Sequence, residues 1–593
     1  MYLDWRKRDT YVVDIETDSL APTVIWVMCT MNVLTGEKGE YTSVEEIQGF
    51  FERTAGALYV GHNILEFDAP ALRRLASVNI SETNCIDTMI LSMLYSPNID
   101  GGHSLGAWGE RINKPKGDFD DFEGGLTQEM IDYCHQDVAV CTEVFVRLMK
   151  TLDKLNFSEQ SIWIQHRLWV LLNQQRRNGF KFDGPRALGL YTELRAVEAD
   201  YAAQVREVFP AERVHVANRQ LKKKNGEFTN IYLKDRDRYE VVISNKQPNT
   251  YDAYEYVEFN LGSPPQRVAK LKELGWEPWP DDPKTKTGNP KPFEKGKLAP
   301  SLEAMLEENP VPQIRLLARW MLINGRANMV NTWLEAWNEK DGCIHGKLFV
   351  ADTLRLRHQS PNTANIPAVR SGEGGPLLGD AGDFTYEARD LWVAREGRVL
   401  VGTDAAGLEL RMLANYINRP AFTEQVVNGD PHQFNADTVG ISRGLAKTLL
   451  YAIQYGAQPY KVSTILKVSV AEATKVRLEF LERLGLKEVM DAAIAEQERG
   501  RIELCDGSQV VCPSPHAALN YKLQGGGARV MFLAGILLDR HIRRERLDSL
   551  KVGDIHDEWQ FDVHPDHAER HAELSVRSIR ESGELLKLNV PLD

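Results

Sequence analysis

The sequence lacks any apolar run long enough to cross a membrane. The nearest candidate, Val530 to Leu538, ends at Asp539, whereas a spanning helix needs about 20 apolar residues. Met1 to Arg8 has no continuous apolar core, which argues against a signal peptide. We therefore expect a protein without membrane association that works in the cytoplasm.

Cysteine is scarce and scattered. The seven cysteines form no pairs with metal-binding spacing, and Cys505 and Cys512 stand too far apart for a zinc knuckle. An odd, dispersed set is typical of buried free thiols in a reducing compartment. Internal repeats and low-complexity segments are also missing, and a chain of 593 residues should hold about three or four domain-sized units.

An excess of positive charge is missing as well, since the formal net charge is −13. This argues mildly against a nucleic-acid partner, but phosphate binding needs only a local basic track. Pro210 to Tyr256 contains such a track, with tyrosines between Arg219, Lys222 to Lys224, Lys234, Arg236 and Arg238. The segment is either a solvated surface insertion or a patch that follows a nucleic-acid backbone or docks a partner.

Two acids share one face of a predicted strand near the N-terminus. The run Tyr11 to Asp18 has strand character, and its alternation places Asp14 and Glu16 on the same side. Two carboxylates on one strand face are unfavourable unless they are solvated or bind a metal. The pair therefore favours a divalent cation.

More polar side chains extend this pattern. Asn63 lies near the end of a second predicted strand, Ala57 to Ile64, and Asp68 follows that strand. Tyr133 and Asp137 stand four apart on a predicted helix, hence on one face. Each alone would more often be a solvated acid or a helix cap. Together, DxE, NxxxxD and YxxxD indicate a two-metal site that clamps the oxygens of a phosphodiester, with Tyr133 orienting the water.

The middle of the chain is mainly helical in pattern. Helices are predicted over residues 161–179, 186–208, 311–325 and 327–337. Another helix should open at Pro264. Beside it, Asn260, Ser263 and Gln266 would donate hydrogen bonds to phosphates.

A second candidate site begins at Val401 to Arg411, where a predicted strand ends in Asp404 before small residues. Alone, Asp404 would more often cap a helix. A predicted hairpin from Val552 to Val563 places His556 and Asp557 at its turn. We expect Asp404 and Asp557 to form a buried pair that holds two magnesium ions.

A predicted helix within Ser442 to Gly456 carries a graded stripe of side chains. Arg443, Lys447, Tyr451 and Tyr455 recur every four residues and so form one slanting line. The cations suit a polyphosphate, and the tyrosines can stack on a base or sugar. The alternative is that the tyrosines pack inward while the cations snorkel to solvent.

These motifs resemble known families. The N-terminal motifs resemble the DEDDy type of 3′–5′ proofreading exonuclease. TDxxxxELR at 403–411, RxxxKxxxYxxxYG at 443–456 and HDE at 556–558 resemble motifs A, B and C of the DNA polymerase I family, family A. SPNxANIP at 360–367 matches as well. The small residues after Asp404, Tyr451 and the insertion are most similar to replicative polymerases of short-tailed bacteriophages, which would place the protein in the bacterial host cytoplasm.

The resemblance implies a role for each matching residue. Mg²⁺ would be bound by Asp404, Asp557 and the Ala405 carbonyl in one site, and by Asp14, Glu16, Asp68 and Asp137 in the other. Glu409 would be the steric gate that excludes a ribose 2′-OH. The residues expected at the incoming nucleotide are His432, Arg443 and Lys447 for the triphosphate, Tyr451 for the sugar and Tyr455 for the template base. The residues expected at the primer end are Arg355, Gln524 and His556.

The implied fold is an α/β multidomain protein, with a ribonuclease H-like exonuclease domain at 1–158 followed by a right-hand polymerase domain at 159–593. We expect a thumb at about 184–335 with an insertion at about 210–256, a palm at about 336–414 and 513–593, and fingers at about 415–512. The expected partners of this monomer are primer-template DNA and dNTPs. The insertion would dock a thioredoxin-like or other processivity partner.

Two rival classes fit less well. A single-subunit RNA polymerase would need neither the exonuclease motifs nor Glu409, and a non-catalytic DNA-binding scaffold would have no reason to keep so many acids. The chain departs from the family pattern at Leu354, where glycine is common before the arginine. It also ends at Asp593, where members usually continue through a short tail near the active site.

Overall fold

The computed structural model describes residues 5–80, 84–280, 282–294 and 297–593. The chain divides into two compact units. The first comprises residues 1–181, 343–365 and 393–593, and the second comprises 182–342 and 366–392. Among the described residues, no helix combines the length and apolarity that a membrane span requires.

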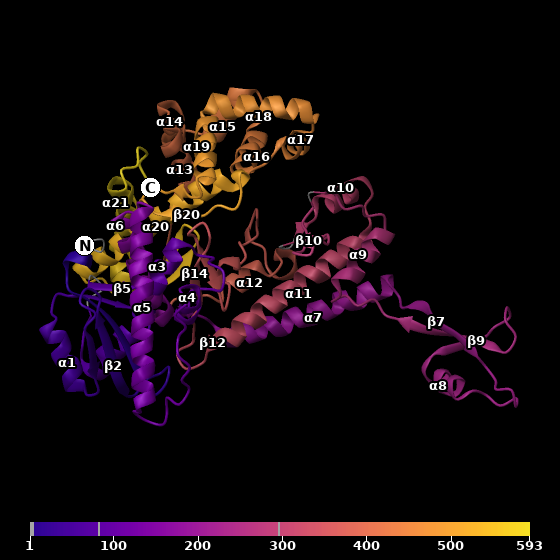
Figure 1. Ribbon diagram of the computed structural model, residues 1–593. Coiled ribbons are helices and arrows are strands. Elements are labelled where there is room, and N and C mark those ends of the chain that lie inside the picture. Colours follow the sequence, from indigo (N-terminus) through magenta and orange to yellow (C-terminus); the bar gives the residue numbers. More distant parts are fainter. Residues whose placement is uncertain (1–4, 81–83, 281, 295–296) are drawn as a thin grey trace. The chain divides into compact units, whose positions relative to one another are not determined.

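A mixed five-stranded sheet, in the order β3-β2-β1-β4-β5, forms the N-terminal part of the first unit (Figure 1). β1, β4 and β5 pair in parallel, whereas β1 with β2 and β2 with β3 pair antiparallel. The strands are β1 (Thr10–Thr17), β2 (Ile25–Asn32), β3 (Lys38–Tyr41), β4 (Leu58–Gly61) and β5 (Cys85–Asp87). The helices are α1 (Val44–Arg53), α2 (Asp68–Ala76), α3 (Thr88–Tyr95), α4 (Leu105–Arg111) and α5 (Gln128–Lys154).

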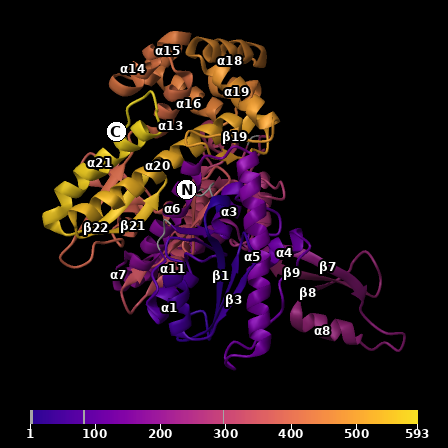
Figure 2. The same cartoon turned by 60° about the vertical axis from the view of Figure 1, so that its left-hand side comes forward.

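Alternating apolar residues give this sheet two buried faces. Val12 and Val60 pack in a cluster with Val138 of α5, while Val13 and Met28 pack with the residues of α1 and α2. The long helix α5 runs along the sheet in both views (Figures 1 and 2). β1 is therefore a central strand covered on both sides, as the predicted α/β class requires.

A second sheet in the first unit is antiparallel, in the order β18-β22-β21. Its strands are β18 (Val399–Asp404), β21 (Ser549–Ile555) and β22 (Glu558–Val563). The helices of this region are α6 (Glu159–Asn178), α13 (Leu408–Ile417), α14 (Pro420–Asn428), α15 (Pro431–Val439), α16 (Arg443–Gln454), α17 (Pro459–Leu466), α18 (Val470–Leu484), α19 (Leu486–Glu498), α20 (Ala518–Glu545) and α21 (Ala568–Leu585). Short strands are β6 (Phe180–Lys181), β13 (Cys343–Ile344), β14 (Lys347–Val350), β15 (Leu356–Gln359), β19 (Ile502–Glu503) and β20 (Gln509–Val510).

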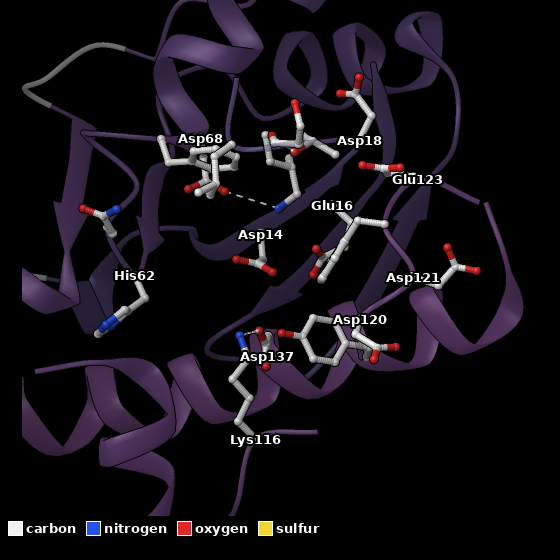
Figure 3. Close-up of a pocket in the computed structure, with 18 residues that line it drawn as sticks. Asp14, Glu16, Asp18, His62, Asp68, Lys116, Asp120, Asp121, Glu123 and Asp137 are labelled. Carbon is white, nitrogen blue, oxygen red and sulfur yellow. Dashed lines mark hydrogen bonds and ion pairs between the residues drawn. The ribbon is translucent and has the colours of Figure 1, made fainter. Parts of the chain in front are cut away.

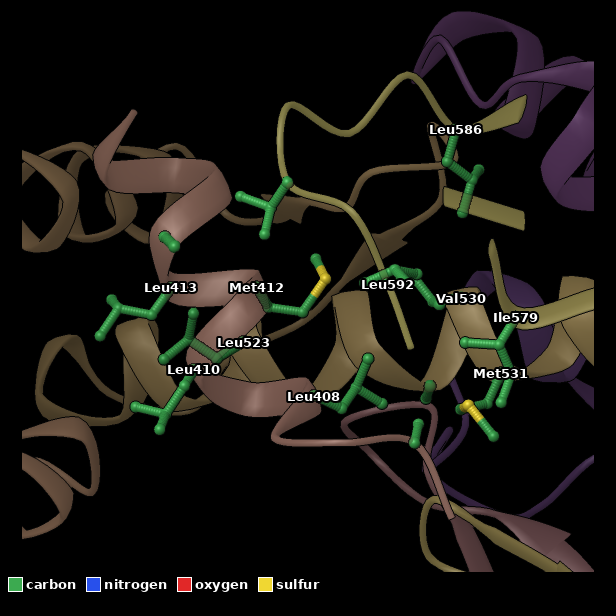
Figure 4. Close-up of a cluster of buried hydrophobic side chains, with 14 of the residues drawn as sticks. Leu408, Leu410, Met412, Leu413, Leu523, Val530, Met531, Ile579, Leu586 and Leu592 are labelled. Carbon is green, nitrogen blue, oxygen red and sulfur yellow. The ribbon is translucent and has the colours of Figure 1, made fainter. Parts of the chain in front are cut away.

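One large apolar cluster holds this region together (Figure 4). Leu408 and Met412 of α13 share it with Val530 of α20 and Ile579 of α21. The last residues of the chain join it, because Leu592 is buried in the same cluster. The backbone N–H of Ala406 also donates to the carbonyl oxygen of Asp593 at 2.7 Å, and the guanidinium of Arg411 donates to the carbonyl of Pro591.

In the second unit, α7 (Gly184–Val208) packs along α11 (Pro312–Ala336) (Figure 1). The prediction of two helices over 311–325 and 327–337 was wrong, because α11 continues through Gly325. Ile323, Ala327 and Val330 are fully buried on one helix face. Their burial outweighs the cost of about 1 kcal/mol for a glycine inside a helix. The predictions for α6, α7 and the start of α9 (Pro264–Glu273) were confirmed.

The segment 210–256 is a small folded element in this unit. A three-stranded sheet, in the order β7-β9-β8, packs with α8 around Tyr251. The elements are β7 (Glu212–Gln220), α8 (Asn230–Arg238), β8 (Glu240–Ile243) and β9 (Thr250–Val257). Asp235 accepts hydrogen bonds from Tyr251 Oη and Arg219, each at 2.6 Å. Arg219 is thus engaged within the insertion, whereas Lys222, Lys223 and Lys224 are exposed. The remaining elements of the unit include α10 (Pro300–Glu308), α12 (Thr385–Arg389) and the hairpin of β10 (Phe293–Glu294) with β11 (Lys297–Leu298).

A buried ion pair ties α20 to the segment between β19 and β20, and hydrogen bonds from the same arginine reach α6. The guanidinium of Arg529 is fully buried and donates to Asp506 at 2.5 Å, to Gln165 and to the carbonyl of Ser161. We expect Arg529→Met to destabilise the first unit by about 3–5 kcal/mol, because it leaves a buried carboxylate unpaired. Thermal unfolding followed by circular dichroism would measure the loss.

The matched control is Arg570→Met. Arg570 pairs with Glu545 on the surface, and exposed pairs contribute little. The melting temperature of Arg570→Met should therefore equal that of the unchanged protein. Equal transitions for the two variants would contradict a structural role for the buried pair.

Candidate active sites

A cavity of about 670 Å³ opens beside the central strand β1. Asp14 and Glu16 point into it from β1, Asp68 from the start of α2 and Asp137 from α5 (Figure 3). Ligand atoms of Asp14, Glu16 and Cys134 lie within 4.8 Å of one another. The alternation of β1 therefore places the two acids as the sequence predicts, and Asp68 and Asp137 line the same cavity.

Burial and mutual repulsion raise the pKa values of these acids. Burial raises the pKa of Glu16 to about 8, with added repulsion from Asp137 and Asp68. Burial also raises the pKa of Asp68 to about 7 and that of Asp14 well above its ordinary value. The cluster is unfavourable when fully ionised unless a cation joins it.

The donor set fits a divalent cation. Asp137 Oδ1 is buried and has no hydrogen-bond partner among the described residues, which is unusual for a buried carboxylate oxygen. The cavity offers several carboxylate oxygens close together, and these are the ligands that Mg²⁺ prefers. Asp14, Glu16, Asp68 and Asp137 are thus the residues that would hold metal ions here.

The loop between β4 and α2 is held by an acid to which the motifs gave no role. Asp87 is 1% exposed and accepts hydrogen bonds from the backbone N–H of Asn63 and of Leu65, at 2.9 and 3.2 Å. Asn63 has a φ of 64°, a conformation that Asn tolerates better than most residues. His62 also lines the cavity, and burial lowers its pKa to about 4.

Tyr133 and Asp137 meet a cation that the sequence motifs do not include. The ammonium of Lys116 lies 2.6 Å from Asp137 Oδ2 and 4.8 Å from the centre of the Tyr133 ring. Burial raises the pKa of Tyr133, while hydrogen bonding to Lys116 opposes that effect. The sequence does show a lysine, Lys116, directly before Gly117 and an acidic, aromatic run. No local pattern, however, indicates that this lysine pairs with Asp137.

The second site lies at one end of the antiparallel sheet. Asp404 pairs in register with Glu558, and the N–H of Ala405 donates to the carbonyl of Asp557 at 3.2 Å. His556, at the turn between β21 and β22, has a φ of 62°. Asp404 and Asp557 are therefore brought side by side by the strand and the hairpin, as the sequence predicts.

The prediction of a buried pair was wrong. Asp404 is exposed and Asp557 is half-buried, because β18 is an edge strand whose end opens to solvent. Partial burial and the charges of Asp557 and Glu558 still raise the pKa of Asp404. Two neighbouring carboxylates that oppose each other's ionisation fit a divalent cation, and the carbonyl of Ala405 is adjacent.

Glu409 and Arg355 form an ion pair next to this site. Arg355 donates to Glu409 Oε1 at 2.8 Å, and both side chains are partly buried. Leu354 has a φ of 62° and is fully buried. The leucine thus takes the left-handed conformation that a glycine adopts easily.

The stripe on α16 lies on an exposed face. Arg443 and Lys447 are exposed, Tyr451 is half-buried and Tyr455 is 57% exposed, so the alternative of inward-packed tyrosines was wrong. The guanidinium of Arg443 pairs with Asp430 at 2.6 Å.

Two further residues lie close to this stripe. The ring centroid of His432 is 5.8 Å from that of Tyr451. Gln524 donates to Tyr455 Oη at 3.3 Å. The residues predicted around an incoming nucleotide are thus neighbours along one face.

The three residues predicted as phosphate donors near α9 bond mainly among themselves. The N–H of Asn260 donates to Gln266 Oε1 at 2.8 Å, and Asn260 Oδ1 accepts from Gly262 at 2.9 Å. Ser263 is the N-terminal cap residue of α9, and its side chain makes no capping hydrogen bond. These residues belong to the second unit.

The fold is that of an α/β protein with two compact units, and each of the two carboxylate sites has a donor set that suits a divalent cation. Residues 233–593 match the family "DNA polymerase family A". The chain therefore belongs to DNA polymerase family A.

Relatives and a solved structure agree with this assignment. The chain is 28% identical to the DNA-directed DNA polymerase of Escherichia phage T7, over 93% of each chain, and 28% identical to that of Enterobacteria phage T3, also over 93% of each. A structure titled "POL domain of Pol1 from M. smegmatis complex with DNA primer-template and dNTP" has a TM-score of 0.73, covering 99% of this chain and 94% of that one. At 18% identity, this likeness concerns the fold alone.

The raised pKa values predict a pH-dependent response to magnesium. A carboxyl whose pKa is higher in the folded than in the unfolded protein stabilises the fold at low pH, and this contribution is lost as pH rises through the folded pKa. For Glu16 the loss should be complete only above its folded pKa of about 8. In EDTA, the melting temperature of the first unit should therefore fall between about pH 6 and about pH 8.5.

Magnesium should offset more of this loss at the higher pH, because it binds the ionised acids. Calorimetry at the two pH values, with and without Mg²⁺, would measure the difference. The control, Asp14→Asn with Glu16→Gln, should remove most of the pH dependence. An equal magnesium effect at both pH values would refute the linkage.

Proposed function

We propose that the chain is a template-directed DNA polymerase that extends a primer 3′-OH with dNTPs and also removes nucleotides from a 3′ end. The supporting observation is the presence of two separate carboxylate clusters in a member of family A. One lies at the end of β18, beside the exposed stripe of α16. The other lines the cavity beside β1.

At the polymerase site, Asp404, Asp557 and the Ala405 carbonyl would hold two magnesium ions. Bound ions there would supply Lewis-acid activation of the 3′-OH and neutralise the pyrophosphate charge. Lys447 and Arg443 would bind the triphosphate. Because Arg443 is paired with Asp430 in this structure, nucleotide binding would exchange one anionic partner for another.

Sugar selection is assigned to Glu409. Its carboxylate is held by Arg355, and its charge contributes to raising the pKa of the nearby Tyr451 hydroxyl, where burial is the larger cause. A carboxylate that is held by a cation and lies close enough to act on Tyr451 would be positioned to exclude a 2′-hydroxyl. We propose further that Tyr455 and Gln524 contact the template base and the minor groove, with His556 at the primer terminus.

At the exonuclease site, Asp14, Glu16, Asp68 and Asp137 would hold two magnesium ions that activate water and stabilise the leaving oxygen. Tyr133 would orient the attacking water. Its hydroxyl lies within the same hydrogen-bonded group as Asp137 and Lys116. We propose that these residues form a DEDDy proofreading site of ribonuclease H-like fold.

The domain roles follow the same assignment. We propose that residues 1–158 form the exonuclease domain. Within 159–593, palm, fingers and thumb would follow the boundaries expected from sequence, and the protein would act as a monomer in a bacterial host cytoplasm. Asn260, Ser263 and Gln266 of the thumb would contact primer-template DNA, and the folded insertion would dock a processivity partner, such as a thioredoxin-like protein, through its exposed residues.

Changing each acid pair should separate the two activities. Asp404→Asn or Asp557→Asn should lower primer extension about a thousandfold or more while leaving 3′-end degradation intact. Asp14→Ala with Glu16→Ala should do the reverse. Extension and shortening of a labelled primer-template, with and without dNTPs, would measure both. Loss of both activities in one correctly folded variant would refute the assignment of two sites.

Glu409→Ala should relax sugar selection. We expect the preference for dNTP over rNTP, as a ratio of kcat/KM values, to fall about 10- to 100-fold, because the space for a 2′-hydroxyl is opened. Single-nucleotide incorporation assays would measure the ratio. Glu424→Ala, which changes an exposed glutamate on α14, is the matched control. An unchanged ratio for Glu409→Ala would sink the gate assignment.

A further inference from the structure

The cavity beside β1 contains one charged group that opposes all the others. Lys116 is the single lysine or arginine among the described residues that line it, and the remaining charged lining residues are acids (Figure 3). Its Nζ reaches Asp137 Oδ2 at 2.6 Å, with the lysine side chain 33% exposed and the aspartate 4% exposed. Such a position differs from that of a surface lysine, whose ammonium lies in water.

The backbone around Lys116 is held in place from both neighbouring helices. Gln136 of α5 donates to the carbonyl of Pro115 at 3.0 Å, and Lys114 donates to the carbonyl of Ala139 at 3.2 Å. At Gly109 of α4, a Cβ would lie 2.7 Å from the carbonyl oxygen of Lys114 and 3.2 Å from the nitrogen of Lys116. The loop therefore approaches α4 at a distance that only a glycine allows, and this close approach fixes the position of the Lys116 backbone.

The two carboxylate oxygens of Asp137 have different surroundings. Oδ2 is paired with Lys116, while Oδ1 is buried without a hydrogen-bond partner among the described residues. Leaving a buried carboxylate oxygen unpaired is unfavourable. The ammonium of Lys116 therefore fixes Oδ2 and orients the carboxylate so that Oδ1 is available to a cation.

The charge of Lys116 acts on the whole cluster. It opposes the raised pKa values of Asp14, Glu16 and Asp137, although burial dominates each of them. A DNA phosphate entering among these acids would be repelled, and a fixed positive group beside Tyr133 reduces that repulsion. The same charge repels a divalent cation. Lys116 should therefore strengthen the binding of the DNA phosphate and weaken the binding of the metal ion.

We propose that Lys116 is a positioning residue of the 3′–5′ exonuclease reaction. Its ammonium holds the Asp137 carboxylate and the Tyr133 hydroxyl in place, favours the DNA phosphate and weakens divalent-cation binding. This inference rests on the proposed exonuclease function. It also distinguishes Lys116 from a residue that only stabilises the fold, because its removal should change metal affinity and activity in opposite directions.

The test uses the full chain carrying Asp404→Asn and Asp557→Asn, so that cations at the polymerase acids do not obscure the result. In this parent, Lys116→Met should bind Mn²⁺ about threefold or more tightly, measured by electron paramagnetic resonance without DNA. Its kcat for degrading single-stranded DNA should fall about tenfold or more, with a raised KM. Lys116→Arg keeps the positive charge, so its Mn²⁺ affinity and its degradation of single-stranded DNA should both lie closer to those of the parent.

The matched control is Lys114→Met, which removes the same charge two residues away and loosens the same loop. It should keep the Mn²⁺ affinity of the parent. Parental Mn²⁺ affinity in Lys116→Met would overturn the proposal, even with lower activity and a lower melting temperature, since it would assign a purely structural role. Unchanged degradation would overturn it as well. A parent that degrades no DNA with Mg²⁺ or Mn²⁺ would refute the exonuclease itself, and the proposal with it.

Discussion

Repulsion between carboxylates held at strand ends is the constraint on which both sites depend. Asp14 and Glu16 share one side of β1, and Asp404 stands opposite the hairpin that carries Asp557. Apolar packing behind each strand, on two faces of β1 and on the cluster around α13 and α20, holds the acids where their charges oppose one another. The folding free energy of these cores is what keeps the acids together. A divalent cation then gains affinity from an arrangement that is unfavourable without it.

The two sites meet this constraint differently because their strands occupy different places in a sheet. β1 is central and covered on both faces, so Glu16 is buried, Asp14 is half-buried and the pKa of Glu16 rises to about 8. β18 is an edge strand, so Asp404 is exposed and water screens much of its repulsion with Asp557. The buried site accordingly has an internal counter-charge in Lys116. In the exposed site, the nearest ion pair, Arg355 with Glu409, lies beside the acids and not among them.

Sequence could predict the features that depend on local periodicity. The alternation of β1 predicted the shared face of Asp14 and Glu16, and the spacing of α16 predicted the stripe from Arg443 to Tyr455. Features set by tertiary burial were missed. Gly325 looked like a helix end, yet the buried face of α11 carries the helix through it. The openness of the Asp404 site also follows from strand order, which no local pattern contains.

Ion pairs between residues far apart in sequence could not be predicted either. Arg355 and Glu409 were each assigned a separate contact from motif resemblance, and nothing local indicated that they pair. Lys116 and Asp137 come from a loop and a helix that are brought together by the close approach of the loop to Gly109 and by its hydrogen bonds to α5. In both cases the residue type was visible in the sequence, but its partner was not.

Leu354 shows how a departure from a family pattern can preserve a site. Its φ of 62° is the left-handed conformation, which is unfavourable for an L-residue by about 1–2 kcal/mol. Complete burial of its side chain, beside Val350 and Leu504, contributes about 1.5–3 kcal/mol in the opposite direction. The apolar contact thus offsets the backbone cost that a glycine would avoid. The turn before Arg355 keeps a conformation suited to glycine, and the arginine still reaches Glu409.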